Sequence, residues 1–184
     1  MAPSAPARAV KILALVSILF SALPLRAADV SRLADFAGTY STNGTAVVTR
    51  GKSERVMGTA TMDFRIASSG KSARLKISGK FETADETVIQ FSTSLILRGN
   101  KRVLITNLAP GFEDRRLAKG SYSATPSRIT VSADFGFAKT SGRATVLVKL
   151  QRVRNETWLS VIQTLDTSEL DLPLEWTFKA LRTP

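Results

Sequence analysis

Several short segments combine residue types that carry out chemistry in other proteins. Gly51-Lys52-Ser53 and Gly70-Lys71-Ser72 match the end of a phosphate-binding P-loop, in which backbone amides and a lysine hold phosphate groups. That loop also needs a glycine five positions before its Gly-Lys pair, and Ala46 and Arg65 stand there instead. Both segments are expected at hairpin turns and not at the start of a helix. We therefore predict no phosphate site in either.

Two further groups resemble catalytic or metal sites. Ser68-x-x-Lys71 matches the nucleophile and base of β-lactamases, but that serine works at the start of a helix and with companion motifs that this chain lacks. Glu82, Asp85 and Glu86 could hold calcium, or pair a neutral carboxyl group with an ionised one. A solvated acidic turn explains them more simply. The sequence thus predicts no catalytic residues and no metal ligands.

The composition narrows the possible chemistry further. The 184 residues include no histidine and no cysteine. Ser-His-Asp and Cys-His catalysis, and the common zinc and copper sites, need residues that are missing here. We predict a binding protein without a cofactor. A cofactor-free isomerase or cyclase is a third possibility, and it would need Asp63, Asp134 or Tyr122 to point into a cavity.

The first 27 residues predict export. Two basic residues precede the apolar run Ile12–Leu23, which is shorter than the roughly 20 residues of a membrane-spanning helix, and Ala27 offers a small residue for cleavage. We expect residues 1–27 to be a signal peptide and residues 28–184 to form one soluble domain in the periplasm or outside the cell. Without cysteine, that domain has neither disulfides nor a lipidated anchor.

Period-two alternation dominates the rest of the chain and predicts half-buried β-strands. Val56, Met62 and Phe64 share one face of such a run, while Thr61 and Asp63 share the other. Short turns rich in glycine, serine, asparagine and proline separate the runs, which favours antiparallel hairpins. The expected strands span residues 38–50, 54–67, 72–83, 86–98, 101–108, 115–124, 127–138, 142–153, 157–166 and 174–181.

An open sheet of eight to ten consecutive strands would expose two long edges, and closure into a barrel removes them. The predicted fold is therefore an all-β, antiparallel up-and-down barrel with a short N-terminal helix near residues 29–36. A β-sandwich is the alternative. The positions of Leu104, Leu147, Leu159 and Val161 predict apolar side chains on both faces of parts of the sheet, so we predict either a covering segment or a homodimer.

The segment Asp35-Phe36-Ala37-Gly38-Thr39-Tyr40 resembles the Gly-x-Trp start of the lipocalin and calycin barrels, with Tyr40 where tryptophan is usual. The resemblance covers about a dozen residues and lacks the superfamily's later Thr-Asp-Tyr signature and C-terminal helix. It implies a helix that plugs one end of an eight-stranded barrel, an aromatic side chain packed beneath that helix, and a cavity that binds small apolar ligands.

The leading functional prediction is a carrier of a small amphiphilic or lipid-like molecule. The residues expected to line the interior are Phe64, Phe81, Phe91, Phe135 and Phe137. In a simple meander, alternate hairpins lie at opposite ends, and one end then collects seven cations against Glu156. These residues, named the basic rim, are Lys71, Arg74, Arg98, Lys101, Arg102, Arg128 and Arg154.

The net charge supports a negatively charged partner. Removing Arg8, Lys11 and Arg26 with the signal leaves 23 basic and 15 acidic side chains, a net charge of +8. An exported basic protein meets anionic lipids and envelope polymers more readily than nucleic acid. The alternative function is thus an envelope interaction module that binds anionic polymers or a protein partner.

Overall fold

The computed structural model describes residues 30–50, 52–82, 84, 86–107, 117–137, 140–168 and 170–184. The predicted signal peptide and Asp85 of the acidic turn lie outside the described residues, as does the side chain of Phe137.

One short helix and ten strands follow each other along the chain. They are the 3-10 helix η1 (Val30–Phe36) and the strands β1 (Gly38–Arg50), β2 (Lys52–Ile66), β3 (Ser72–Glu82), β4 (Val88–Arg98), β5 (Arg102–Thr106), β6 (Leu117–Thr125), β7 (Arg128–Phe137), β8 (Thr140–Val153), β9 (Glu156–Thr167) and β10 (Leu174–Arg182). Each strand boundary lies within two residues of its prediction. The reason is that period-two alternation and turn residues are local signals.

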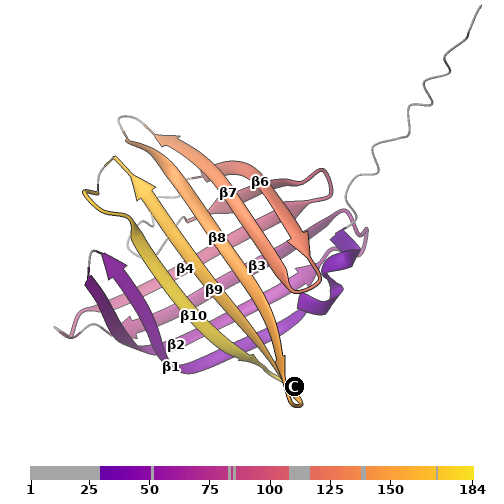
Figure 1. Ribbon diagram of the computed structural model, residues 1–184, viewed down its shortest axis with the longest axis horizontal. Helices are drawn as coiled ribbons and strands as arrows, with labels where there is room; N and C mark the ends of the chain where they lie inside the picture. Colours follow the sequence, from indigo (N-terminus) through magenta and orange to yellow (C-terminus); the bar gives the residue numbers. More distant parts are fainter. Residues whose placement is uncertain are drawn as a thin grey trace, which may run out of the picture.

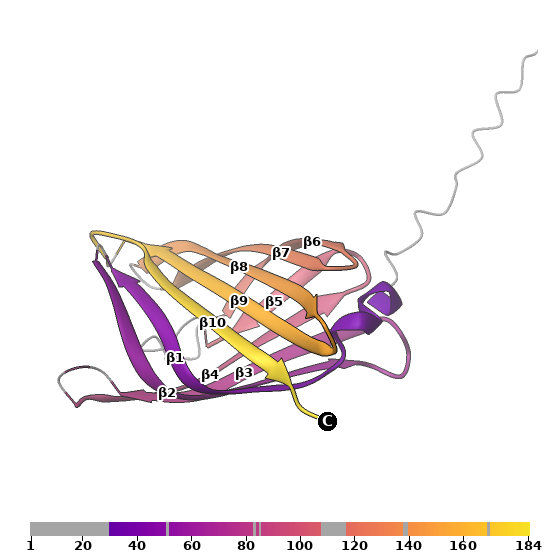
Figure 2. The ribbon, with the colours of Figure 1, turned by 60° about the horizontal axis from the view of Figure 1, so that its bottom comes forward.

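The ten strands form a closed antiparallel barrel. Every strand pairs with its neighbours in sequence, and β1 also pairs with β10. The barrel is flattened into two walls, with β1 to β4 on one side and β7 to β10 on the other (Figures 1 and 2). The predicted barrel is confirmed and the sandwich alternative is wrong, because the β1–β10 pairing leaves the sheet no open edge.

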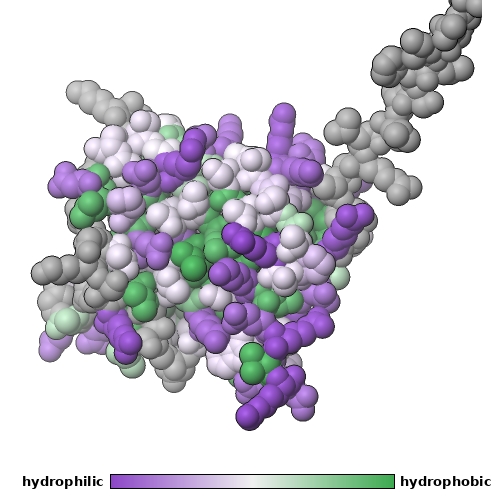
Figure 3. Space-filling model, in the orientation of Figure 1, coloured by the Kyte–Doolittle hydropathy of each residue, from purple (hydrophilic) through white to green (hydrophobic). Residues whose placement is uncertain are grey.

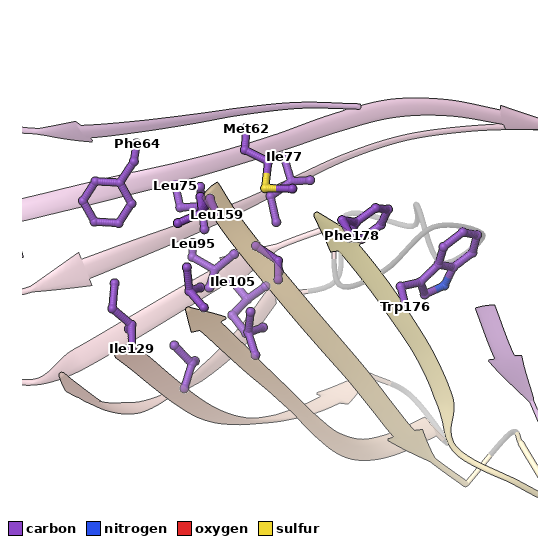
Figure 4. Close-up of a cluster of buried hydrophobic side chains, with 14 of the residues drawn as sticks. Met62, Phe64, Leu75, Ile77, Leu95, Ile105, Ile129, Leu159, Trp176 and Phe178 are labelled. Atoms are coloured by element: carbon purple, nitrogen blue, oxygen red, sulfur yellow. The ribbon is translucent and has the colours of Figure 1, made fainter. Parts of the chain in front are cut away.

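The meander gives the barrel two distinct ends. One, named the plugged end, holds η1 and the turns at residues 67–71, 99–101, 126–127 and 154–155. The opposite end is named the aromatic end because four aromatic rings lie inside it. Figure 4 shows Phe64 at one side of the core, Trp176 and Phe178 at the other, and aliphatic side chains between them.

The outward-facing rows are mostly polar, and Figure 3 shows hydrophilic and pale residues interspersed with apolar ones over β7 to β10. Leu159 and Val161 are fully buried and face the interior, so the prediction that they lie on a second apolar face is wrong. Leu104 and Leu147 do lie on the outer face, where they are half-buried. Trp158 also faces outward, and the ammonium group of Lys179 lies 4.8 Å from its ring centroid.

Interior glycines make room for aromatic rings on neighbouring strands. Gly58 pairs across strands with Phe81, and Gly79 pairs with Phe91. A Cβ atom added at Gly58 would lie 2.9 Å from Cδ1 of Phe81, and one added at Gly79 would lie 2.9 Å from Cε1 of Phe91. Each ring therefore lies over the backbone of a glycine, a packing that also lets the sheet bend.

This packing predicts a large difference between two glycine substitutions. Gly58→Ala should destabilise the barrel by about 1–3 kcal/mol, because its Cβ would lie 2.8 Å from the Cα of Phe81 and force the strand or ring to move. Gly136→Ala is the matched control, since its Cβ meets nothing within 4 Å, and it should gain about 0.4–1 kcal/mol. Urea unfolding of both variants measures the two changes. Similar values for both would contradict the proposed packing.

Candidate functional site

The plugged end is closed by η1. Val30, Leu33 and Phe36 of this helix are buried, and the Phe36 ring centroid lies 5.7 Å from that of Phe64. The Tyr40 hydroxyl donates a hydrogen bond of 2.9 Å to the Phe36 carbonyl. The helix therefore plugs the barrel with an aromatic side chain packed beneath it, the arrangement expected from the segment Asp35 to Tyr40.

Arg182, near the end of the chain, holds the plug in place. Its guanidinium carbon lies 5.2 Å from the Tyr40 ring centroid, and one terminal nitrogen donates to the Tyr40 hydroxyl at 2.7 Å and to the Asp35 carbonyl. Gly38 has a φ of +144°, and a Cβ there would lie 3.1 Å from Nε of Arg182. Glycine at position 38 thus provides both the backbone conformation and the space for the arginine.

The predicted interior phenylalanines divide between the two ends. Phe64 packs against the plug, while Phe81 and Phe91 lie near the aromatic end. Phe135 is also buried toward that end, where it pairs with Gly142. The structure describes the side chains of four of the five predicted phenylalanines, and among these four only Phe81 and Phe91 are in direct ring contact.

Two rings that the prediction did not include complete this group. Phe81, Phe91, Trp176 and Phe178, named the ring cluster, have centroids 5.4 to 6.2 Å apart in all six pairings. These distances are typical of attractive aromatic contacts. The rings come from β3, β4 and β10, so they bring together strands that lie on both sides of β1 and β2. The cluster forms a continuous apolar surface inside the barrel.

Gln163 is an amide buried beside this surface. Its side chain is 1% exposed, faces inward from β9, and pairs across strands with Trp176 on β10 and Val146 on β8. Within the described part of the chain, neither its amide nitrogen, nor its amide oxygen, nor Nε1 of Trp176 has a hydrogen-bond partner. Buried polar groups in folded proteins are nearly always satisfied. Two donors and an acceptor therefore point into the barrel without protein partners.

An outer groove lies over Phe91. It has a volume of about 630 Å³, and its lining residues are Ser78, Gly79, Lys80, Gln90, Phe91, Ser92 and Asn107. β5 ends at Thr106, so its ladder with β4 stops at Ser94, and beyond that point Asn107 contacts β4 through hydrogen bonds with Ser92 and Thr93. Phe91 is the most exposed of the four rings, at 6%. This is the place where the ring cluster comes nearest to solvent.

The basic rim is also assembled as the meander predicts. All seven residues are exposed and lie at the turns or strand ends of the plugged end. Lys119, the third residue of β6, is not at a turn of the plugged end, but it lies on the outer face beside Leu104, a position that the prediction missed because it depends on the β5–β6 register.

The carboxylates considered for catalysis do not face the interior. Asp63 lies on the outer face and pairs with Arg65 at 2.6 Å, and Asp134 pairs with Arg143 at 2.8 Å. Tyr122 is buried inside, but its hydroxyl already donates to the Arg98 carbonyl at 2.9 Å. The described residues contain no group of three acidic side chains that could hold a metal ion. They also contain no helix that is long and apolar enough to cross a membrane.

Comparison with protein-family models, with curated proteins and with solved structures finds no match to this chain. The barrel itself is compatible with the lipocalin-like architecture, although it has ten strands and not eight. Residue geometry is therefore the basis for any functional assignment.

We expect the folded barrel to lose stability at alkaline pH, because both tyrosines of the chain are buried. Burial raises the pKa of Tyr40, with Arg182 partly opposing this, and burial also raises the pKa of Tyr122 above the ordinary 10.0. Each phenol thus keeps its proton more tightly when the chain is folded. The stability due to these two groups should be complete below about pH 10 and should fall as the pH rises through the folded pKa values.

Tyrosinate absorbance and urea unfolding, both measured against pH, check this expectation. The absorbance change should begin only above pH 10.0 and should accompany unfolding. Tyr122→Phe should make the alkaline loss of stability less steep. Ionisation of both phenols at their ordinary pKa in the folded chain would contradict the burial.

Proposed function

We propose that the barrel binds a small, mostly apolar molecule that carries one hydrogen-bonding group. The observation that supports this is the unpartnered pair Gln163 and Trp176, buried inside the aromatic end. Their polar atoms offer one acceptor and two kinds of N–H donor. An alcohol, amide or carboxylic acid group of a ligand would satisfy them, and its apolar part would contact the ring cluster.

The size of the barrel supports the same proposal. Eight strands enclose a space that side chains alone just fill, or that holds one small ligand, and barrel diameter increases with the number of strands. A ten-stranded barrel must therefore fill a wider interior. Here the plug fills one end and the ring cluster fills part of the other.

We propose that the ligand reaches this site through the outer groove over Phe91. The four rings already touch one another, so an apolar ligand either lies beside them or displaces one. Phe91 is the ring best placed to move, because it is the most exposed and because Gly79 beside it has no side chain. Lys80, Gln90 and Asn107 on the groove wall would then meet the polar part of an arriving molecule.

Replacing Gln163 should change the stability of the barrel and its affinity for a ligand in opposite directions. Gln163→Leu removes a buried amide without partners and keeps a similar volume, so we expect the free energy of unfolding to rise by about 1–2 kcal/mol. Leu165→Met, on the same inward row, is the matched control and should change stability by less than about 1.5 kcal/mol. Thermal and urea unfolding measure both. A destabilised Gln163→Leu variant would mean that the amide is satisfied in the folded protein.

Binding is tested with N-phenyl-1-naphthylamine, a neutral apolar probe with a single N–H donor and strong fluorescence in apolar surroundings. We expect saturable binding to the full chain, with affinity roughly 3- to 10-fold weaker for Gln163→Leu and unchanged for Leu165→Met. Binding that is not saturable, or that is equal for all three proteins, would overturn the proposal. Native mass spectrometry of the protein from its own host then identifies the molecule that copurifies.

A further inference from the structure

A second feature lies on the outer wall, away from the interior site. A groove of about 500 Å³ runs over β4, β5 and β6 near the plugged end. Its lining residues, named the cationic groove, are Arg98, Arg102, Val103, Leu104, Lys119 and Gly120. All three charged side chains are exposed, and Leu104 between them is half-buried.

The strand register explains why the cations surround an apolar floor. Leu104 pairs with Ile96 on β4 and with Lys119 on β6, and all three face outward. Arg102 is the next outward residue on β5, and Arg98 is the last residue of β4 beside it. Diagonal neighbours such as Arg102 and Lys119 lie on the order of 7–8 Å apart in an antiparallel pair. One anionic group can therefore contact both.

None of the three cations forms an ion pair within the described residues. The nearest carboxylate in register is Asp134, opposite Lys119, and Arg143 already occupies it at 2.8 Å. Other arginines on the outer face do have acidic partners, as Arg65 has Asp63. The cationic groove is thus a concentration of unpaired positive charge, which favours an anion from solution.

We propose that the cationic groove binds the phosphate headgroup of an anionic phospholipid and so holds the barrel on a membrane surface. A phosphate would contact the arginines and Lys119, while Leu104 and Ile96 would contact the glycerol and the first acyl carbons. A soluble polyanion would fit a long line of charges better than three cations grouped on two sides of an apolar floor. The remaining basic rim lies on the same end and would face the same membrane. This inference does not depend on the interior site.

Co-sedimentation with phosphatidylcholine vesicles, with and without phosphatidylglycerol, tests the proposal on the full chain. The expected result is binding that needs phosphatidylglycerol and weakens with salt. The triple variant Arg98→Gln, Arg102→Gln and Lys119→Gln should lose about fivefold in affinity for each cation, on the order of 100-fold in total. Vesicles of phosphatidylcholine alone measure what the apolar segment Ile12–Leu23 contributes in every variant.

The matched control removes the same charge elsewhere on the outer face. Arg55→Gln, Lys76→Gln and Lys149→Gln change exposed strand residues away from both grooves, and should cost less than tenfold. Far-ultraviolet circular dichroism and thermal unfolding confirm that both triple variants fold. Arg98→Lys with Arg102→Lys keeps the charge and should keep most of the binding.

Three results would overturn the proposal. Equal losses in the two triple variants would mean that net charge alone acts. Equal binding to both kinds of vesicle would mean that no anionic headgroup is recognised. Binding of inorganic polyphosphate as tight as that of the vesicles, lost in the same groove variant, would assign the groove to a polyanion and not to a lipid.

Discussion

The pairing of β1 with β10 is the contact on which the rest of the structure depends. It joins the first and last strands, removes both sheet edges and fixes the number of strands around the interior at ten. The same pairing places Tyr40 opposite Arg182, so the contact that closes the barrel also anchors the plug. Barrel closure and end closure are therefore coupled. A change at Arg182 would act on both.

Closure with ten strands creates the packing problem that the interior residues solve. The plugged end is filled by a helix, which needs only apolar residues at helical spacing. The aromatic end is filled by large rings from the wall itself, and these fit because glycines stand opposite Phe81 and Phe91. Gln163 differs from a buried polar residue such as Thr93, whose hydroxyl donates to the Asn107 carbonyl at 2.7 Å, because the Gln163 amide has no partner within the described residues. An amide without a partner is costly in a purely structural core, so its position is better explained by recognition than by packing.

Local patterns in the sequence were enough to predict the strands, the helix, the barrel and the shared end of the basic rim, because alternation and turn residues act over a few positions. Contacts across the barrel were not predictable in the same way. The pairing of Gly58 with Phe81, and the position of Lys119 beside Leu104, depend on register between strands. Gln163 did leave a signal, as a polar residue in the inward row between Val161 and Leu165. Trp158 belongs to the opposite row of the same strand, and that alternation places it outside.

The positions of the two proposed sites constrain how they would act together. The cationic groove lies near the plugged end, whereas Gln163 and the ring cluster lie toward the aromatic end. If the groove held the barrel on a membrane, η1 would lie between the membrane and the interior site. Phe36 of this helix is fully buried. A ligand could not pass straight from the bilayer through that end without displacing the plug and its contacts to Arg182. Exchange would instead use the wall beside Phe91, where β5 is short and the outer groove meets the ring cluster. The membrane contact would then concentrate the barrel near its ligand. The ligand would enter and leave through a different part of the wall from the surface that contacts the membrane.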